Sequence, residues 1–509
     1  MQNRTIKIVR KVLSSNKFFI FVLVLFVMES ALIALTAAYP QAFDENFHFG
    51  LIKIYSHYIS PYLTSQPPNA NAYGAVARHA SFLYQYLMSW PYRLIEMFVK
   101  TQIYQIIILR LIDIAFFTGG LYFFRKVLLR FRISKALANL TILLFILIPI
   151  VPQLAGQINY DDLLFLLVPL NVLLSFRIID ELKNKNANFV TIGGLLILAT
   201  LTSLVKYAFL PMYLAIVLIL IYQVLKNFKK LSIFFKSLSD SFVKTNLILK
   251  IVFIVFILIS LGSFAQRDGY NLVKYHSVSP SCSQVLSNKA CSSYSVWKAN
   301  FDRHQLVIKG KATPSTNIIF YLGQWSYWMW YRLFFAINGP KQEFKNYPPL
   351  PLPSAIGAIL GIYGIFILVK YFKKILKDDD YAQLLFLISL IYIVALIVQG
   401  YITYKYTAVL ENMNGRYLIP MLILLLGLIL KGSYYLFKSK PFLKTILSLI
   451  VLVLFLQGGG ALTYIIRSDS TWYIHSKKVT RITKIAKKIT KKVIIKGKKT
   501  YNSHVWFFN

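Results

Sequence analysis

The stretch KFFIFVLVLFVMESALIALTAA, residues 17–38, is a continuous apolar block that contains a single acid, Glu29. A helix needs about 20 apolar residues to cross roughly 30 Å of hydrocarbon, so this block is long enough to span a membrane. It is too long for the apolar region of a signal peptide and has no small-residue cleavage site, so we expect a retained anchor. The block therefore predicts a membrane protein.

The rest of the chain repeats this pattern. Together the blocks predict an all-α polytopic membrane protein with about 11 transmembrane helices. The further blocks lie at residues 103–123, 136–155, 162–178, 189–206, 208–225, 247–265, 354–372, 382–400, 417–436 and 443–465. Around Lys206 and Pro211 the sequence fits either two short spans or one span with a re-entrant piece. Hydrophobic residues make up 57% of the 509-residue chain and charged residues 15%, which excludes an ordinary soluble protein.

The basic residues set the predicted orientation. The chain has 57 Lys and Arg against 18 Asp and Glu, which gives a formal net charge of +39. The basic residues lie between apolar blocks, whereas a nucleic-acid binder would carry them as stripes on a hydrophilic chain. The N-terminal arm and the loops at 226–250, 370–377 and 431–444 are basic, and all lie on one side if the N-terminus is cytoplasmic. The abundance of Lys, Ile, Asn and Phe is typical of an AT-rich bacterial genome, so we expect a bacterial plasma-membrane protein.

This orientation divides the chain into four regions. An N-terminal transmembrane module, 1–265, contains a long first outer loop at 39–102. A second outer loop covers 266–353, a C-terminal transmembrane module covers 354–465, and a basic tail covers 466–509.

The tail carries a dense positive charge, with 12 Lys and Arg and one acid in residues 467–499. Apolar residues at helical spacing from Lys477 to Lys499 predict a basic amphipathic helix that lies on anionic lipid, with a solvated tail as the alternative. Eleven spans place this tail outside, whereas ten or twelve place it inside.

Cys282 and Cys291, the chain's two cysteines, both lie in the second outer loop. An oxidising compartment favours one disulfide bridge between them, and two free thiols are the alternative. The chain has no GxxxxGK[ST], GxGxxG, HExxH or CxxC motif, so we expect neither ATP as a direct energy source nor a metal site of protein ligands alone.

The acids at the ends of the predicted spans are the candidate catalytic groups. Asp44 and Glu45 follow the first span, and Asp161 and Asp162 begin the fourth. An acidic pair near aromatic residues and His48 suits a general base, and the second pair could hold an acceptor hydroxyl or a divalent cation. The alternative is that both pairs only cap helix ends.

Two acids lie inside predicted spans, where an ionised carboxylate is costly. Arg110 and Asp113 are three residues apart on one helix face, so we expect them to neutralise each other. Glu29 has no partner nearby in the sequence, so it is either protonated against a neighbouring helix or faces a polar cavity.

Two basic residues lie at outer ends of predicted spans. Lys206 is in TSLVKYAFLP, and Arg416 is in ENMNGRYLIP. A lysine and an arginine at headgroup depth suit a lipid-linked phosphate, which Arg binds by its fork and Lys as a point charge. Snorkelling of both side chains to the interface is the alternative.

These features together resemble the C-type glycosyltransferase fold, the group that includes protein O-mannosyltransferases and aminoarabinose transferases. The resemblance covers about residues 1–230 and 400–465. It rests on the Asp44-Glu45 pair, Arg110 in LRLIDIAFFTGGLYFFRK, the turn from Asn159 to Asp161, TSLVKYAFLP and NGRYLIPML. The NGRYLIP element also looks like that of poorly characterised multi-pass proteins encoded with bacterial surface-polysaccharide genes.

The resemblance implies an inverting transfer of a sugar from a polyprenyl phosphate to a surface glycan, lipid or protein at the outer membrane face. Asp44 matches the acid that deprotonates the acceptor, with Glu45 beside it, and Asp161 matches a second acid that positions acceptor or metal. Asp162 makes the assignment within its pair ambiguous, and a divalent cation at Asp161 and Asp162 is one option.

The remaining site residues are expected to bind substrate. Lys206 and Arg416 match contacts to the donor phosphate, and His48 and Asn159 complete this predicted set. The expected partners are the lipid-linked donor, the acceptor and membrane lipids, without nucleic acid.

Two other functions stay open. A polysaccharide polymerase or ligase would use outer-loop basic residues, of which the second loop offers Arg267, His276, Arg303 and His304. A glycan flippase or transporter should line its cavity with mid-span charges, and only two acids occupy such positions.

Overall fold

The computed structural model describes residues 2–334, 336–340, 344–346, 351–377, 379–411, 413–437 and 459–502. Within these ranges the structure is helical apart from one short antiparallel pair of strands, β1 (Ala336–Asn338) and β2 (Phe344–Asn346), with Ile337 opposite Lys345. The all-α architecture predicted from the sequence is therefore confirmed for the described part of the chain.

Several helices have the length and apolar character that a membrane span requires. Seven such segments are present in the described residues: α2 (Asn16–Thr36), α5 (Gln102–Arg130), α8 (Tyr160–Lys183), Tyr207–Asn227 with α10 (Leu210–Asn227), Leu247–Tyr275 with α12 (Leu247–Phe264) and α13 (Tyr270–Tyr275), α19 (Asp380–Thr407), and Gly415–Leu436 with α20 (Ile419–Leu436). Each coincides with a predicted span. The total of eleven spans stays a prediction.

Residues 136–155, which were predicted as one span, do not form one continuous helix. They form two helices, α6 (Lys135–Ile146) and α7 (Ile150–Ala155). The cause is Pro149, because proline lacks the N–H that would continue α6 and disfavours helical geometry in the residue before it. The uncertain region near Lys206 forms two helices, α9 (Phe189–Val205) and α10, separated by Lys206 in extended conformation.

Two predicted spans lie near or outside the limits of the described residues. Helix α18 (Pro351–Leu376) includes the predicted span at 354–372. Of the predicted span at 443–465, residues up to 458 lie outside the described part of the chain, and the remainder belongs mostly to α22 (Ala461–Arg467).

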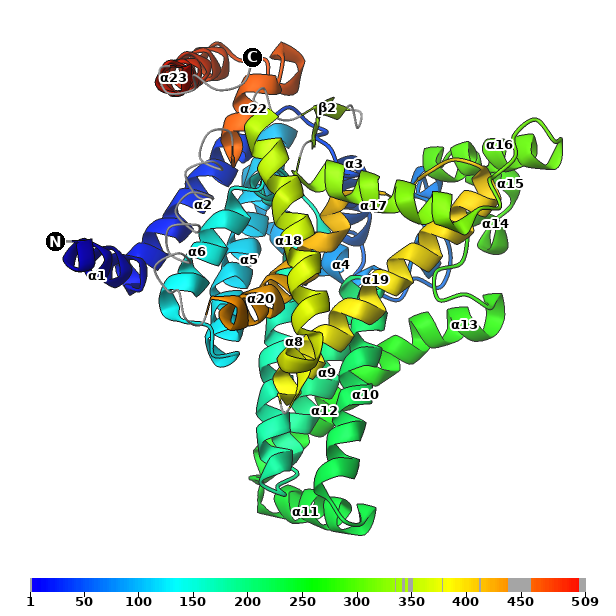
Figure 1. Cartoon of the computed structure of the whole chain (residues 1–509). Helices are drawn as coiled ribbons and strands as arrows, with labels where there is room; N and C mark the ends of the chain where they lie inside the picture. The colour runs from blue at the N-terminus through cyan, green and yellow to red at the C-terminus, as the bar shows by residue number, and fades with distance from the viewer. Residues whose placement is uncertain are drawn as a thin grey trace.

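The other helices cluster at the two ends of the long ones. They are α1 (Gln2–Leu13), α3 (Glu45–Tyr55), α4 (Leu83–Phe98), α11 (Leu231–Lys244), α14 (Cys282–Val285), α15 (Asn288–Cys291), α16 (Ser295–Ile308), α17 (Ile318–Phe334) and α23 (Lys477–Asn502). Helix α11 lies at the bottom of Figure 1, whereas α3, α16, α22 and α23 lie near the top. We call this second end the Asp44 end, because Asp44 immediately precedes α3.

Asparagine and serine side chains begin several of the long helices, as expected for residues that accept hydrogen bonds from free N–H groups. Ser15 Oγ accepts from Phe18 N at the start of α2. At the start of α8, Asn159 Oδ1 accepts a hydrogen bond from Asp161 N at 2.9 Å. At the start of α9, Asn188 Oδ1 accepts one from Val190 N, also at 2.9 Å. These caps fix where each helix enters the bundle.

Close packing of α2, α5 and α8 forms the core beneath the Asp44 end. The rings of Phe117 and Phe165 stack at 3.9 Å between centroids, and Phe26 packs on Phe117 at 5.3 Å. Gly120 lets α5 approach α8, since a Cβ there would lie 2.6 Å from the Phe165 carbonyl oxygen. Small residues permit such close approach between membrane helices.

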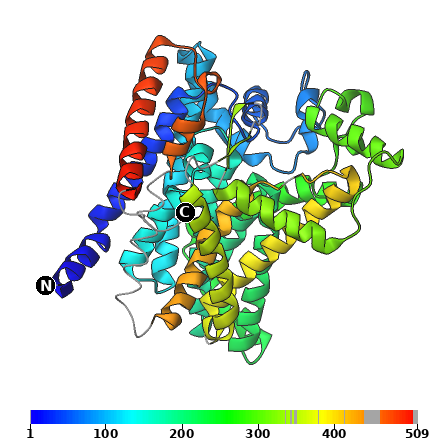
Figure 2. The same cartoon turned by 45° about the horizontal axis from the view of Figure 1, so that its top comes forward.

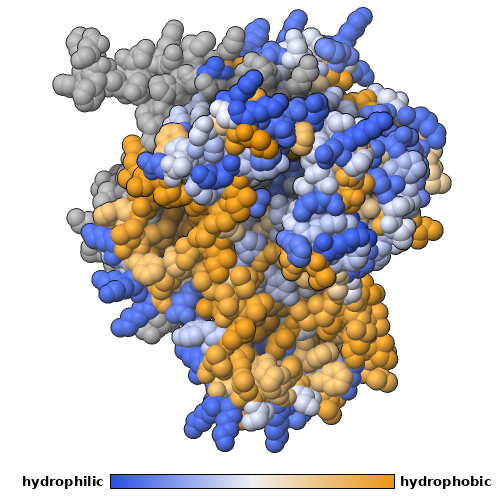
Figure 3. All heavy atoms as spheres, turned by 90° about the vertical axis from the view of Figure 1, so that its right-hand side faces the viewer, coloured by the Kyte–Doolittle hydropathy of each residue, from blue (hydrophilic) through white to orange (hydrophobic). Residues whose placement is uncertain are grey.

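The surface has the polarity of a membrane protein. Figure 3 shows a broad hydrophobic region with hydrophilic residues above and below it. Helix α12 contributes much of the exposed apolar area, since Leu247, Ile248 and Leu258 are each more than 60% exposed. Apolar side chains on this scale are stable only against lipid or another protein surface.

Candidate functional site

Chain segments far apart in the sequence meet at the Asp44 end. Figure 2 shows α22 and α23, in orange and red, beside the blue α2 at this end of the molecule. The structure brings seven of the eight predicted site residues into one network of side-chain contacts: Asp44, Glu45, His48, Asn159, Asp161, Lys206 and Arg416. Within the described part of the chain the eighth, Asp162, joins them only through its backbone N–H, which donates to Asn159 O at 3.2 Å.

Asp44 occupies the N-cap position of α3 but does not cap it with its side chain. Both Phe43 and Asp44 have left-handed backbone conformations, with φ of 58° and 66°. Such strain in a non-glycine residue costs about 1–3 kcal/mol and is concentrated at functional sites. The turn leaves the Asp44 side chain 36% exposed, and its Oδ2 accepts a hydrogen bond from Arg416 Nη2 at 2.9 Å.

Arg416 is held in place by the two residues before it. Asn414 Oδ1 accepts a hydrogen bond from Arg416 N at 3.1 Å, and Gly415 packs directly on the backbone of Leu333 in α17, where a Cβ would clash. The guanidinium lies over the rings of Phe43 and Tyr417, 5.0 and 5.1 Å from their centroids. Its Nε and Nη1 are buried and have no hydrogen-bond partner among the described residues. Arg416 therefore retains donors for an anion.

A second acid–base pair lies beside the first. Lys206 Nζ donates to Asp161 Oδ1 from the extended break between α9 and α10, and both side chains are nearly buried. Lys206 Nζ also lies 4.5 Å from the Tyr160 ring centroid and 5.2 Å from that of Tyr417. Because Tyr417 also contacts Arg416, one aromatic ring joins the two cations.

Glu45 is fully buried and bound by Arg110, with Nε–Oε1 at 2.7 Å and Nη2–Oε2 at 2.8 Å. The Glu45 carboxylate also accepts from the backbone N–H groups of Gln41 and Ile158. All its oxygens are thus engaged within the protein. We infer that Glu45 positions the neighbouring Asp44 and does not act on the substrate.

The predicted pairing of Arg110 with Asp113 is wrong. Arg110 turns to Glu45 and to three carbonyl oxygens at the end of α2, those of Ala34, Ala37 and Ala38. A guanidinium has five donors and so satisfies both a carboxylate and the free carbonyls of a helix end. Asp113 instead accepts from the Tyr84 hydroxyl at 2.7 Å.

Asn159 and Asp162, which were predicted to bind substrate, are both buried inside the protein. Asn159 caps α8 and donates from Nδ2 to Phe43 O at 2.9 Å, so its amide joins α8 to the strained turn. Asp162 is fully buried, and neither of its side-chain oxygens has a hydrogen-bond partner among the described residues.

A metal site was one option for Asp161 and Asp162. Among the residues that the structure describes, no group of three or more His, Cys, Asp or Glu side chains is arranged to hold a metal ion.

His48 lies behind Asp44 on α3 and is 2% exposed. Its ring meets the Tyr160 ring edge-on at 4.4 Å. Burial lowers the pKa of His48 to about 3; nearby Asp44 opposes this change, while Arg416, His79 and Lys206 add to it. His48 is therefore neutral near pH 7.

The second loop contributes one aromatic residue, Tyr294, that the sequence interpretation missed. A disulfide joins Cys282 and Cys291, as predicted, and Tyr294 N donates to Cys291 O at 2.9 Å. The Tyr294 ring packs against Gly74 and lies 6.1 Å from the Phe47 ring. Burial raises the pKa of Tyr294 to about 12, with Asp44 adding to the effect. Its position three residues after Cys291 is the sequence feature that could have identified Tyr294 as a candidate site residue.

The basic residues that suggested a polymerase make separate structural contacts. Arg267 is buried and donates to His79 O at 2.9 Å and Pro61 O at 3.1 Å. Arg303 pairs with Glu411, and the His304 ring stacks on Tyr406 at 3.7 Å. Glu29 packs against Gly460, the residue before α22, so it contacts protein backbone in the described structure.

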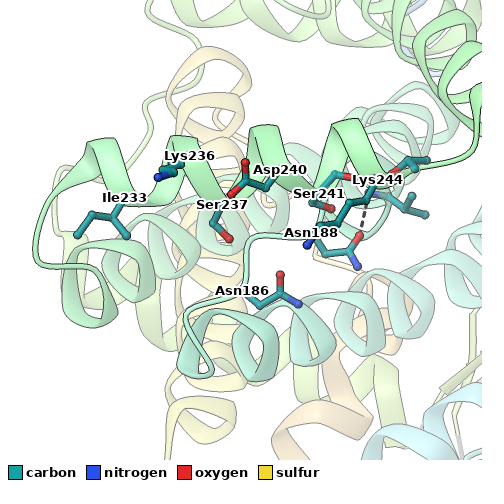
Figure 4. Close-up of a pocket in the computed structure, with 10 residues that line it drawn as sticks. Asn186, Asn188, Ile233, Lys236, Ser237, Asp240, Ser241 and Lys244 are labelled. Atoms are coloured by element: carbon teal, nitrogen blue, oxygen red, sulfur yellow. Dashed lines mark hydrogen bonds between the residues drawn. The ribbon is translucent and has the colours of Figure 1, made fainter.

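A polar pocket lies at the opposite end of the molecule, between α11 and the turn before α9 (Figure 4). It encloses about 580 Å³ and contains none of the predicted site residues. Its Ser237 and Ser241 hydroxyls accept hydrogen bonds from Ala187 N and Phe189 N. These serines therefore fasten α11 to the start of α9.

No family model, curated protein or solved structure matches this chain. The resemblance to C-type glycosyltransferases consequently remains a hypothesis, and the functional argument rests on the geometry of the Asp44 end.

Proposed function

We propose that this protein is a membrane glycosyltransferase that transfers a sugar from a polyprenyl-phosphate donor to an acceptor at the cell surface. In this proposal the chain has about 11 spans in the bacterial plasma membrane, and the Asp44 end faces outside. One observation carries the proposal. Partly exposed Asp44 is paired with Arg416, and Arg416 keeps two donor nitrogens without a partner among the described residues.

Asp44 has the properties of a general base for an acceptor hydroxyl. Its carboxylate is more exposed than those of its buried neighbours Glu45 and Asp161, so an acceptor can reach it. In the proposed step, Asp44 takes the hydroxyl proton while the acceptor oxygen attacks the anomeric carbon. The bond from that carbon to the phosphate oxygen breaks on the opposite face, which inverts the configuration and releases polyprenyl phosphate.

The cations suit the leaving phosphate. Arg416 can keep Nη2 on Asp44 and offer Nε and Nη1 to phosphate oxygens. Lys206, on the other side of Tyr417, supplies a second positive charge. Cations fixed where negative charge develops lower the barrier of the transfer step.

The acid–base pairs of the site also fit the proposal. Unpaired charges are costly near a membrane interior, so Asp44 and Asp161 neutralise the two cations before the donor binds. A donor phosphate then brings further negative charge to cations that the protein already orients.

The test is acceptor-dependent release of polyprenyl phosphate. Purified wild-type protein in detergent is mixed with a panel of polyprenyl-phosphate sugars, with and without a cell-envelope acceptor fraction. The proposal predicts release that requires both protein and acceptor. Movement of the donor across a proteoliposome bilayer without release would instead identify a flippase and overturn the proposal.

A further inference from the structure

Helix α23 divides into three faces. Eight of the sixteen residues 477–492 are Lys or Arg and none is acidic. At 3.6 residues per turn, Lys477, Arg481 and Lys484 lie on one face, and Ile482, Ile485 and Ile489 lie on a second. Val479, Thr483 and Thr490 lie on a third.

The third face, and not the isoleucine face, docks onto the protein. Thr483 and Thr490 are 9% and 3% exposed, and Val479 packs on the cluster that contains Ile33, Trp472 and Tyr473. The threonine hydroxyls can be buried because they donate to carbonyl oxygens of their own helix. Lys487 Nζ further ties α23 to Ser468 O at 2.5 Å.

The isoleucine face is left without a protein partner in the described structure. Ile482, Ile485 and Ile489 are 47%, 49% and 57% exposed. An exposed apolar stripe on a helix so rich in lysine costs solvation free energy in water, and this cost is removed if the stripe enters lipid.

The basic face borders this stripe. An open groove of about 660 Å³ is lined by Lys477, Arg481, Lys484, the polar Ser476 and Thr480, and by Ile485 at its apolar edge. Cations next to an apolar edge match a phospholipid, whose phosphate lies beside its acyl chains.

We infer that α23 is a membrane anchor at the Asp44 end, which inserts its isoleucine stripe among acyl chains and binds anionic phospholipid headgroups with its basic face. Helix α23 lies beside α22 in Figures 1 and 2, and Tyr473 forms a β-bridge with Ala37 at the end of α2. The anchor is therefore joined to the end of a predicted span, at interfacial depth. The inference is independent of the proposed sugar transfer.

Depth-dependent quenching tests the inference in the full-length protein. Both native cysteines form the disulfide, so a single new thiol can be labelled with NBD under non-reducing conditions. Ile489→Cys reports on the isoleucine face, and Lys484→Cys, on the basic face, is the matched control. Each labelled protein is placed in nanodiscs of phosphatidylcholine, with or without phosphatidylglycerol, that contain spin-labelled lipid.

We expect about twofold stronger quenching at position 489 than at 484, and a further increase at 489 when phosphatidylglycerol is present. Replacing Lys477, Arg481 and Lys484 together by Gln in the Ile489→Cys protein should abolish that increase. Equal quenching at both positions, or no response to the anionic lipid, would overturn the inference. Protection of both labels by an anionic polysaccharide but not by lipid would assign the helix to a polymer instead.

Discussion

Arg110 binds both carboxylate oxygens of Glu45, at 2.7 and 2.8 Å, and this buried pair fastens the turn before α3 to α5. This ion pair also holds Asp44, the residue directly before Glu45. The two adjacent acids therefore differ in exposure: the Glu45 side chain is buried, whereas the Asp44 side chain is partly exposed.

Replacing Glu45 should damage folding. In Glu45→Ala, Arg110 is left buried without its carboxylate, which typically destabilises a protein by about 3–5 kcal/mol. We expect loss of monodisperse protein in detergent and a lower melting temperature. Glu181→Ala, which removes the partner of the more exposed Arg177, is the comparison and should have a much smaller effect. Normal accumulation and melting of Glu45→Ala would contradict the structural role.

Replacing Arg416 by Lys should weaken donor binding more than it slows turnover. Lysine keeps the charge but loses the planar fork, so hydrogen bonds from Nε and Nη1 to a phosphate are lost. A loss of about 1–3 kcal/mol corresponds to a rise in the donor KM of about 5- to 150-fold. Arg303→Lys, at a second-loop ion pair, is the control. An unchanged donor KM would remove Arg416 from the donor site.

The disulfide should help to hold the Tyr294 ring in its place near Phe47 and Asp44. In the double variant Cys282→Ser, Cys291→Ser, Tyr294 loses the constraint three residues away, so we expect lower transfer with little loss of folded protein. Tyr294→Ala should lower transfer in the same way, whereas Tyr294→Phe should retain most activity because the ring remains. Cys282→Ser alone should also migrate more slowly than wild type on a non-reducing gel. Full activity of Tyr294→Ala would exclude the ring from the site.

Acid should destabilise the fold through His48. Its pKa is lowered to about 3 by burial, so between that value and an ordinary histidine pKa near 6.5 the unfolded chain binds more protons than the folded one. Stability therefore falls as the pH is lowered from about 6.5 towards 3, by at most about 1.4 kcal/mol per pH unit. Melting temperatures from pH 7 to pH 4.5 should fall less steeply in His48→Gln than in wild type. The same slope in both would show that His48 is not responsible, and His57→Gln at an exposed position is the control.

The sequence predicted the long helices well because each needs only a local run of apolar residues. Hydrophobicity alone did not reveal the helix break within residues 136–155, because the apolar run continues across Pro149. It also paired Arg110 with the nearest acid, because the true partner is 65 residues away and buried only after folding. Local spacing carries no information about such contacts.

The sequence was sufficient to identify the residues of the candidate site. It was not sufficient to assign a separate role to each of them. The acids and cations at span ends were identified from their positions, and the structure brings Arg416 to Asp44 across 372 residues. The sequence could not distinguish open Asp44 from closed Glu45, since the two are adjacent and chemically alike. Nor could it place Tyr294, whose role depends on how two loops pack.

The most direct measurement compares polyprenyl-phosphate release by wild type, Asp44→Asn and Asp302→Asn, each purified as monodisperse protein. Asp302 is an exposed second-loop acid paired with Lys298, so its replacement controls for the loss of one negative charge. We predict acceptor-dependent release by wild type and Asp302→Asn and none above background by Asp44→Asn, with all three equally folded. Release by Asp44→Asn at the wild-type rate would contradict the assignment of Asp44 as the base.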